Sequence, residues 1–260
     1  MTAPAPATPG INAVDYDAPL VNPSPAGLYS AVTWVEDGVA VPRWLAGGVR
    51  VLVHNFGGDD AFGVWTAEWC GDPGDNLKDG TRPAKPEPFD PLTVWAYDQC
   101  DLRSQSQTDT RVRAQQNLRM REQIAVEREF AGRLLADAPA PAQVGDVIAA
   151  VSHLEAQLAK TNTTGVIHAS AGAAAIAASE NLIVRQGGAL RTPLGHLWAF
   201  GGGYVDGLGT SLVATSPVFG WRDEASLRDT VEARYNQFVA VAERSVVIGY
   251  ESAVAAATLT

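Results

Sequence analysis

The stretch TDTRVRAQQNLRMREQIAVEREFAGRLLAD, residues Thr108–Asp137, decides the fold of this chain. It contains no proline, and its only glycine is Gly132. Arg, Gln, Glu, Leu and Ala dominate it, and these residues favour helices. The composition therefore predicts one helix of about 30 residues and about 45 Å, as long as a small domain is wide.

The apolar residues of this helix are expected to gather on one half of its circumference, given about 100° per residue. That half carries Val112, Met120, Ile124, Val126, Phe130, Leu134 and Leu135. Leu118 falls off this face. Glu129 and Arg133 stand in the i,i+4 order that favours an ion pair on a helix surface.

Length and composition describe an ordinary globular chain. Its 260 residues are 46% hydrophobic and 18% charged, which is enough for one large core or two modest ones. The formal net charge of -10 argues against a dedicated nucleic-acid binder and fits a soluble, self-repelling subunit. No apolar run is long enough to span a membrane, and the N-terminus has no secretory signal. Cys70 and Cys100 lack metal-site spacing and are expected to be reduced thiols.

The first 26 residues form an arm with a composition of its own. Met1–Ala26 contains six prolines and many alanines, which predicts an extended, polyproline-like chain without a core. Two readings stay open at this point: a disordered tail, or an arm that becomes ordered by lying on another subunit.

The region Gly27–Asp90 is expected to combine β-strands with a long protruding loop. Its strand candidates are Leu28–Val35, Gly48–Phe56 and Phe62–Trp69, separated by glycine- and aspartate-rich turns. The aspartates do not follow the EF-hand spacing, so we expect solvated turns rather than a calcium site.

Short elements alternate in the rest of the chain. We expect helices at Gly145–Lys160, Ala169–Asn181 and Ala225–Ala233, and strands at Pro91–Cys100, Gly165–His168, Leu182–Val184, His196–Phe200, Leu212–Thr215, Pro217–Trp221 and within Asn236–Leu259. Gly201–Gly203 marks a place where the backbone bends or is closely approached.

The sequence offers little catalytic machinery. It has no phosphate-binding loop, no dinucleotide fingerprint and no nucleophile elbow. The four histidines are isolated, so we assign no metal site, cofactor site or catalytic residue. His168 and Ser170 lie close in sequence, but no acid is placed to orient the imidazole. A soluble hydrolase using these residues or the loop aspartates is kept as an alternative.

Glu243 and Arg244 stand out because they interrupt an apolar strand candidate. Either charge would be costly if it were buried alone. We therefore expect a structural salt bridge, formed between the two or with groups on a neighbouring element.

The second half of the chain carries a family resemblance. Its motifs are a T-P-x-G turn at Thr192–Gly195, the pair Gly203-Tyr204, a T-x-P-V segment at Thr215–Val218 and N-x-F-x-x-x-A-E-R-x-x-V-x-G-Y at Asn236–Tyr250. In this order the chain resembles the major capsid proteins of tailed bacteriophages with the Hong Kong 97-like fold.

The resemblance implies an α+β capsid fold with four regions. They are an N-terminal arm (1–26), an extended β-hairpin loop region (27–90), a peripheral domain with the spine helix (91–139 and 226–260) and an axial domain (140–225). The spine would lie with its apolar half on the sheet built by Pro91–Cys100 and Asn236–Leu259. Leu118, off that half, would contact another subunit or the arm.

The resemblance also implies a function without enzymatic activity. Copies would self-assemble as pentamers and hexamers into an icosahedral phage head, in the host cytoplasm, around double-stranded DNA that they do not bind specifically. Portal, scaffold and decoration proteins are candidate partners, and no membrane partner or cofactor is expected. Because the arm starts at Met1 without a scaffolding segment, a separate scaffold or none is expected.

Two features leave the capsid assignment open in its details. Some members of the family join a loop lysine to an asparagine of a neighbour, but no partner can be identified for Lys78 or Lys85, so this chemistry is not carried over. An encapsulin-type nanocompartment shell protein, built on the same fold, is the nearest alternative.

Overall fold

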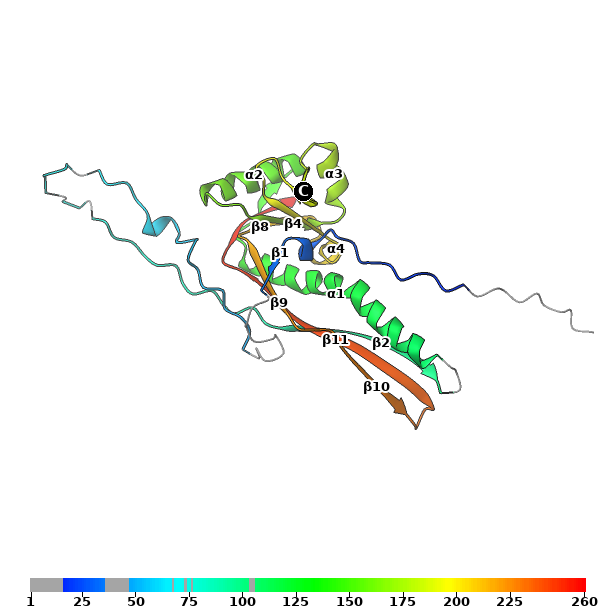
Figure 1. Ribbon diagram of the computed structural model, residues 1–260. Helices are drawn as coiled ribbons and strands as arrows, with labels where there is room; N and C mark the ends of the chain where they lie inside the picture. The colour runs from blue at the N-terminus through cyan, green and yellow to red at the C-terminus, as the bar shows by residue number, and fades with distance from the viewer. Residues whose placement is uncertain (1–15, 36–46, 67, 73, 76, 103–105) are drawn as a thin grey trace, which may run out of the picture.

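The computed structural model describes residues 16–35, 47–66, 68–72, 74–75, 77–102 and 106–260. A long helix packs against two β-sheets, and an extended loop and the arm leave the body on opposite sides (Figure 1). The elements are η1 (Leu28–Ser30), β1 (Val32–Trp34), η3 (Asp59–Ala61), β2 (Leu92–Asp101), α1 (Gln107–Asp137), β3 (Ala142–Val144), α2 (Val147–Lys160), β4 (Val166–Ser170), α3 (Ala173–Ser179), β5 (Val184–Gln186), β6 (Ala189–Arg191), β7 (Leu197–Gly201), α4 (Tyr204–Gly207), β8 (Ser211–Thr215), β9 (Val218–Arg222), β10 (Ser226–Glu232), β11 (Gln237–Tyr250) and β12 (Ala253–Leu259).

Helix α1 confirms the predicted long helix, but its buried face differs from the predicted one. Leu118 is only 2% exposed and belongs to a core cluster with Ala114 and Phe238, so its expected contact with another subunit is wrong. Val112 and Leu135, predicted to face the core, are 38% and 44% exposed. The buried face of α1 also includes threonine, alanine and glutamate residues. The prediction placed only the large apolar residues on that face, so it missed them.

A five-stranded sheet receives one face of α1. Its order is β1-β9-β11-β10, and β2 pairs with β11 in antiparallel register from Val246 opposite Leu92 to Gln237 opposite Asp101. Strand β10 lies where a helix was predicted at Ala225–Ala233, so that prediction is wrong. Seven residues of β10 pair with β11, and this tertiary pairing overrides the weak helix preference of a short polar segment.

A seven-stranded mixed sheet of order β3-β12-β8-β4-β7-β6-β5 forms the other part of the body. Helix α2 packs on it through Leu154 and Leu158, in a core with Ile167 and Trp198. Strand β12 of this sheet consists mainly of small residues and packs against α2. Helix α2 confirms the second helix that the sequence predicted.

The two sheets correct the predicted regions 140–225 and 226–260. Strand β9 falls in the first range but joins the five-stranded sheet, and β12 falls in the second but joins the seven-stranded sheet. The chain bends after β11 because the Ser216 hydroxyl accepts hydrogen bonds from the backbone N–H groups of Glu251 and Ser252, at 2.9 and 3.2 Å. The remaining boundaries of the four regions stay predictions.

The long loop, residues 47–90, is drawn in cyan as a projection from the body in Figure 1. The strands predicted at Gly48–Phe56 and Phe62–Trp69 are wrong, because the described residues of these segments form no strand and their one β-bridge joins Val49 to Phe89. Prolines in the returning leg lack the N–H groups that a ladder needs. The segment Leu28–Val35 likewise divides into η1 and β1.

Two leucines of α1 provide a test of the corrected helix face. We expect Leu118→Ala to lower the free energy of unfolding by ~2–5 kcal/mol, because it empties a packed core site. Leu135→Ala should lower it by less than about 1 kcal/mol, because that side chain is half-exposed. Urea denaturation of both variants measures the difference, and equal losses would contradict the assignment.

Candidate assembly interface

Glu127 of α1 is a buried carboxylate at the meeting point of three segments. It accepts hydrogen bonds from the backbone N–H of Leu28 at 2.9 Å, the backbone N–H of Gly203 at 2.8 Å and the side-chain amide of Gln123 at 2.8 Å. These bonds offset the cost of removing the carboxylate from water. They join the start of η1, the long helix and the turn before α4.

The glycines of that turn allow the close approach that the sequence predicted. A Cβ at Gly203 would lie 2.1 Å from the backbone oxygen of Ile124, and one at Gly201 would lie 2.7 Å from the Glu127 carboxyl carbon. Real Cβ atoms do not come this close to other atoms. The absence of side chains therefore lets the turn rest directly on α1.

A second polar junction ties the five-stranded sheet to α1. Glu122, 4% exposed, accepts a hydrogen bond from the Tyr29 hydroxyl at 2.8 Å and pairs with Arg244 at 3.1 Å. Burial, together with the Glu122 charge, raises the pKa of Tyr29, so this hydroxyl stays a donor. The other charged residue of this part of β11, Glu243, pairs with Arg228 of β10 at 3.4 Å.

His168 of β4 is sealed inside the protein. Its Nδ1 lies 3.0 Å from the Tyr204 hydroxyl and its Nε2 lies 3.0 Å from the Thr215 hydroxyl. Burial lowers the pKa of His168 to about 3, so the ring is neutral at physiological pH. Because both nitrogens are engaged away from solvent, His168 cannot activate Ser170 for attack on a substrate.

Metal ligands, cysteines and membrane spans were the other features that the sequence raised. No group of three His, Cys, Asp or Glu side chains in the described ranges could hold a metal ion. Cys70 and Cys100 are not joined in a disulfide. Within the same ranges, no helix combines the length and the apolar character needed to cross a membrane.

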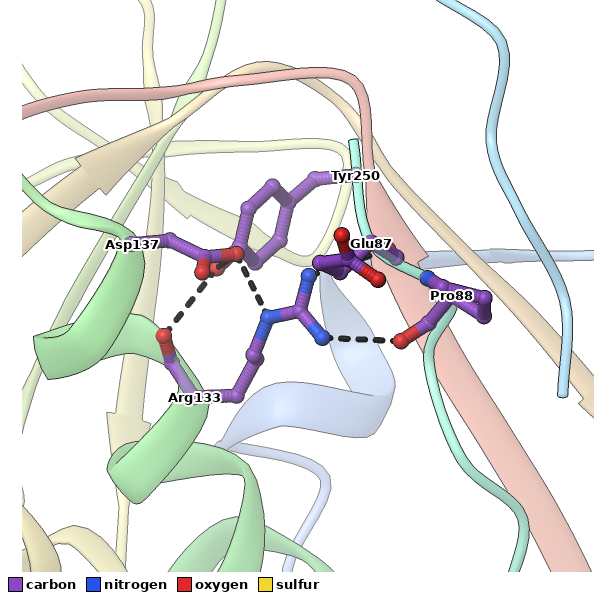
Figure 2. Close-up of polar contacts among 5 residues, drawn as sticks. All are labelled: Glu87, Pro88, Arg133, Asp137 and Tyr250. Atoms are coloured by element: carbon purple, nitrogen blue, oxygen red, sulfur yellow. Dashed lines mark hydrogen bonds and ion pairs between the residues drawn. The ribbon is translucent and has the colours of Figure 1, made fainter. Parts of the chain in front are cut away.

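Arg133, near the end of α1, holds the returning leg of the loop (Figure 2). Its guanidinium donates to the carbonyls of Pro88 at 2.8 Å and Glu87 at 3.0 Å, and its Nε pairs with Asp137 at 2.6 Å. Asp137 is thus the observed partner, in place of the Glu129 expected from spacing. The Tyr250 hydroxyl donates to the same Asp137 oxygen at 3.0 Å, as Figure 2 shows.

Phe89 is the apolar counterpart of this contact. It is 3% exposed, lies edge-to-face with Tyr250 at 4.9 Å, and has the Arg133 guanidinium 4.3 Å above its ring. A Cβ at Gly249 would lie 2.7 Å from the Phe89 ring, so glycine is required where β11 passes under it. The returning leg is therefore fixed to both α1 and β11.

Glu251, in the bend between β11 and β12, holds the outgoing leg. Its carboxylate accepts hydrogen bonds from the backbone N–H groups of His54 at 3.1 Å and Asn55 at 2.9 Å, and from the Asn55 side chain at 2.6 Å. Burial opposes ionisation of Glu251, but the hydrogen bonds from Asn55 and His54 outweigh it and lower the pKa. Sequence reasoning did not predict that Arg133, Asp137 and Glu251 hold the two legs of the loop. The i,i+4 spacing of Arg133 and Asp137 was the one signal that could have indicated their ion pair.

The projecting parts of the molecule carry apolar side chains in water. On the loop, Phe62 is 81% and Trp69 is 98% exposed, and Tyr16 of the arm is 83% exposed. Trp95, on the outer face of β2, is 66% exposed. Concentrated apolar exposure of this kind marks surfaces that other protein covers. Trp198, by contrast, is a core residue.

Comparison with known proteins finds the same fold in phage-type capsids. No family model and no curated protein matches the chain. Among solved structures, the capsid of an empty GTA particle has a TM-score of 0.57 at 14% identity, over 95% of this chain and 94% of that chain. The chain has the Hong Kong 97-like capsid fold.

Two phage structures give the same result. Gordonia phage Cozz has a TM-score of 0.53 at 11% identity, over 97% of this chain and 91% of that chain. Mycobacterium phage Che8 has a TM-score of 0.50 at 12% identity, over 98% of both chains. The fold is thus shared along almost the whole chain, and the α+β capsid class expected from the sequence is confirmed.

Adjacent glycines in the turn above Glu127 give a matched test. Gly203→Ala should lower the free energy of unfolding by about 3 kcal/mol or more, because its Cβ would meet the α1 backbone. Gly202→Ala should change it by less than about 0.5 kcal/mol, since the nearest atom to its Cβ is 3.7 Å away. Thermal denaturation compares the two, and a stable Gly203→Ala protein would contradict this account of the turn.

The two legs of the loop should respond differently to acid. With a folded pKa below the ordinary 4.5, Glu251 contributes stability that is complete above the unfolded value and is lost as pH falls through the folded value. We expect the hydrogen-exchange protection of the Asn55 backbone N–H to decrease below pH 4.5, while the protection of the Phe89 backbone N–H is retained. Glu251→Gln should remove the pH dependence at Asn55, and equal losses at both amides would contradict this assignment.

Proposed function

We propose that this chain is the major capsid protein of a tailed bacteriophage and that it self-assembles into the icosahedral head around the DNA genome. The end-to-end likeness to the GTA capsid is the observation that carries this proposal. The likeness extends over 95% of this chain, and the two phage structures match it over 97% and 98%.

Self-assembly as pentamers and hexamers is supported by the two projections of the subunit. Their exposed apolar side chains have no function in an isolated molecule, and identical copies are the usual partners of such surfaces. A shell of this kind gains stability from many modest contacts rather than from one strong one.

The ion pairs of β11 fit a structural function in the subunit. The Arg244–Glu122 pair is mostly buried, with side chains 24% and 6% exposed, and it links β11 to α1. The Glu243–Arg228 pair lies nearer the surface and links β11 to β10. We assign the larger contribution to stability to the Arg244–Glu122 pair, because loss of Arg244 would leave the Glu122 charge buried without a partner cation.

The acidic balance fits a container rather than a DNA-binding protein. A net charge of -10 gives little affinity for phosphate backbones, so enclosure would hold the genome. Assembly in the host cytoplasm, with portal, scaffold or decoration proteins as further partners, completes the proposal. In this function the chain has no catalytic activity of its own.

Electron microscopy of the expressed protein tests the proposal directly. We expect closed shells, and DNA-filled heads carrying tails where the phage genome is present. Small protein-filled shells without DNA would instead favour an encapsulin-type nanocompartment. A stable monomer of 27.4 kDa under all assembly conditions would contradict both.

Removal of the arm should separate folding from assembly. Among the described arm residues, Val21 is the first that a hydrogen bond joins to α1, with Gln116 donating to its carbonyl at 2.7 Å. Deleting Met1–Leu20 should therefore leave the circular dichroism spectrum and melting temperature unchanged. The yield of shells should fall roughly tenfold or more, because each subunit loses one of its multivalent contacts. Loss of the folded spectrum, or full assembly, would contradict this function of the arm.

A further inference from the structure

A pocket of about 380 Å³ lies where the base of the arm meets α1 and the five-stranded sheet. Its lining includes Pro23 of the arm, Tyr29 of η1, Glu122 of α1 and Arg244 of β11. The polar junction of Glu122 with Tyr29 and Arg244 therefore forms one wall of this pocket. Its volume is within the range of small-molecule sites, ~300–1,000 Å³.

The charges of this pocket are mainly positive, although the whole chain is acidic. Arg119, Arg222 and Arg244 line it together with one carboxylate, that of Glu122. Three positive charges against one negative charge leave a net charge of +2 on its walls. Neighbouring cations repel one another, and an anion between them relieves this repulsion. The pocket therefore favours an anionic ligand.

Arg244 has a donor that the protein itself does not satisfy. Its Nη1 donates to Glu122 at 3.1 Å, whereas its Nε is buried and has no hydrogen-bond partner in the described part of the chain. A buried donor without an acceptor is destabilising, and native proteins rarely retain one without a reason. A ligand oxygen in the pocket would supply the missing acceptor.

The other two arginines also retain donors for a ligand. The Arg222 guanidinium lies 4.2 Å from the centre of the Trp34 ring, and an arginine stacked in this way keeps its N–H groups at the edge of its plane. Arg119 is an exposed residue of α1. Among the described residues, no carboxylate forms an ion pair with Arg119 or Arg222. Both guanidinium groups are thus available to an anion.

A phosphate group fits these arginines better than a carboxylate does. Guanidinium groups bind phosphate through paired N–H···O bonds, and three of them can engage different oxygens of one tetrahedral group. A phosphate monoester carries about −1.5 to −2 charges at pH 7, close to the opposite of the charge on the walls. A carboxylate would neutralise only half of that charge.

From these observations we propose that the pocket binds a phosphate dianion, either free phosphate or the phosphate group of a small phosphomonoester. The Nε of Arg244 and the guanidinium groups of Arg119 and Arg222 would donate to its oxygens. The bound anion would join α1, β9 and β11 beside the base of the arm. This inference does not depend on self-assembly, because one subunit supplies all of these groups.

Isothermal titration calorimetry of the purified full chain tests the site, at constant ionic strength in a buffer without phosphate. Inorganic phosphate and adenosine monophosphate are titrated separately, so that the two sources are distinguished. We expect saturable binding of one phosphate group per subunit. Tighter binding of adenosine monophosphate would assign the pocket to a phosphomonoester, and equal or tighter binding of inorganic phosphate would assign it to the free ion.

Two matched pairs of variants locate the binding. Arg222→Gln should weaken it about tenfold, because a hydrogen bond to a charged group is lost. Arg185→Gln makes the same change at an exposed site on β5 and should leave the affinity unchanged. Arg119→Gln should likewise weaken binding, whereas Arg121→Gln, at an exposed site on the same helix outside the pocket, should not. Circular dichroism checks that all four variants are folded.

The outcomes separate this inference from the proposed function. Absence of saturable heat from both anions with the unmodified chain would overturn the phosphate site. Equal affinities within each matched pair would also overturn it, since the anion would then bind elsewhere. Failure of the chain to form shells would overturn the proposed function and leave the phosphate site standing.

Discussion

The fold depends on one buried carboxylate, that of Glu127. Its two backbone partners, Leu28 and Gly203, lie 99 and 76 positions away along the chain. An uncompensated carboxylate in this position would cost several kcal/mol, so the helix is stable in place only when both segments are docked. The base of the arm, the long helix and the seven-stranded sheet are therefore coupled in one cooperative unit.

The same helix holds its other neighbours through charged groups that sit among apolar ones. Glu122 fixes β11 through Arg244, and Arg133 fixes the loop through the carbonyls of residues 87 and 88. Each of these contacts is directional, unlike hydrophobic packing. A helix that must set the angle of a projecting loop benefits from such contacts, because apolar packing alone would tolerate rotation.

Sequence reasoning succeeded where local pattern and tertiary structure agree. The long helix, α2 and the strand β2 follow from composition and periodicity, and the order of elements indicated the capsid fold. It failed where residues distant in the sequence determine the local structure or burial. Segment β10 is a strand because it pairs with β11. Leu118 is buried because small residues of β2 and β11 leave space for its side chain. Glu127 could not be recognised because its two distant partners are backbone amides, which leave no pattern in the sequence.

The prolines of the returning leg have a consequence for the free subunit. A regular hairpin of this length would expose a row of unpaired N–H and C=O groups, and such an edge recruits any other strand irrespective of its sequence. With Pro83, Pro86 and Pro88 in that leg, the edge has gaps in its donors. The returning leg is therefore a poor template for an added strand, so its contacts with other protein depend on side chains, which can distinguish a correct neighbour from a wrong one.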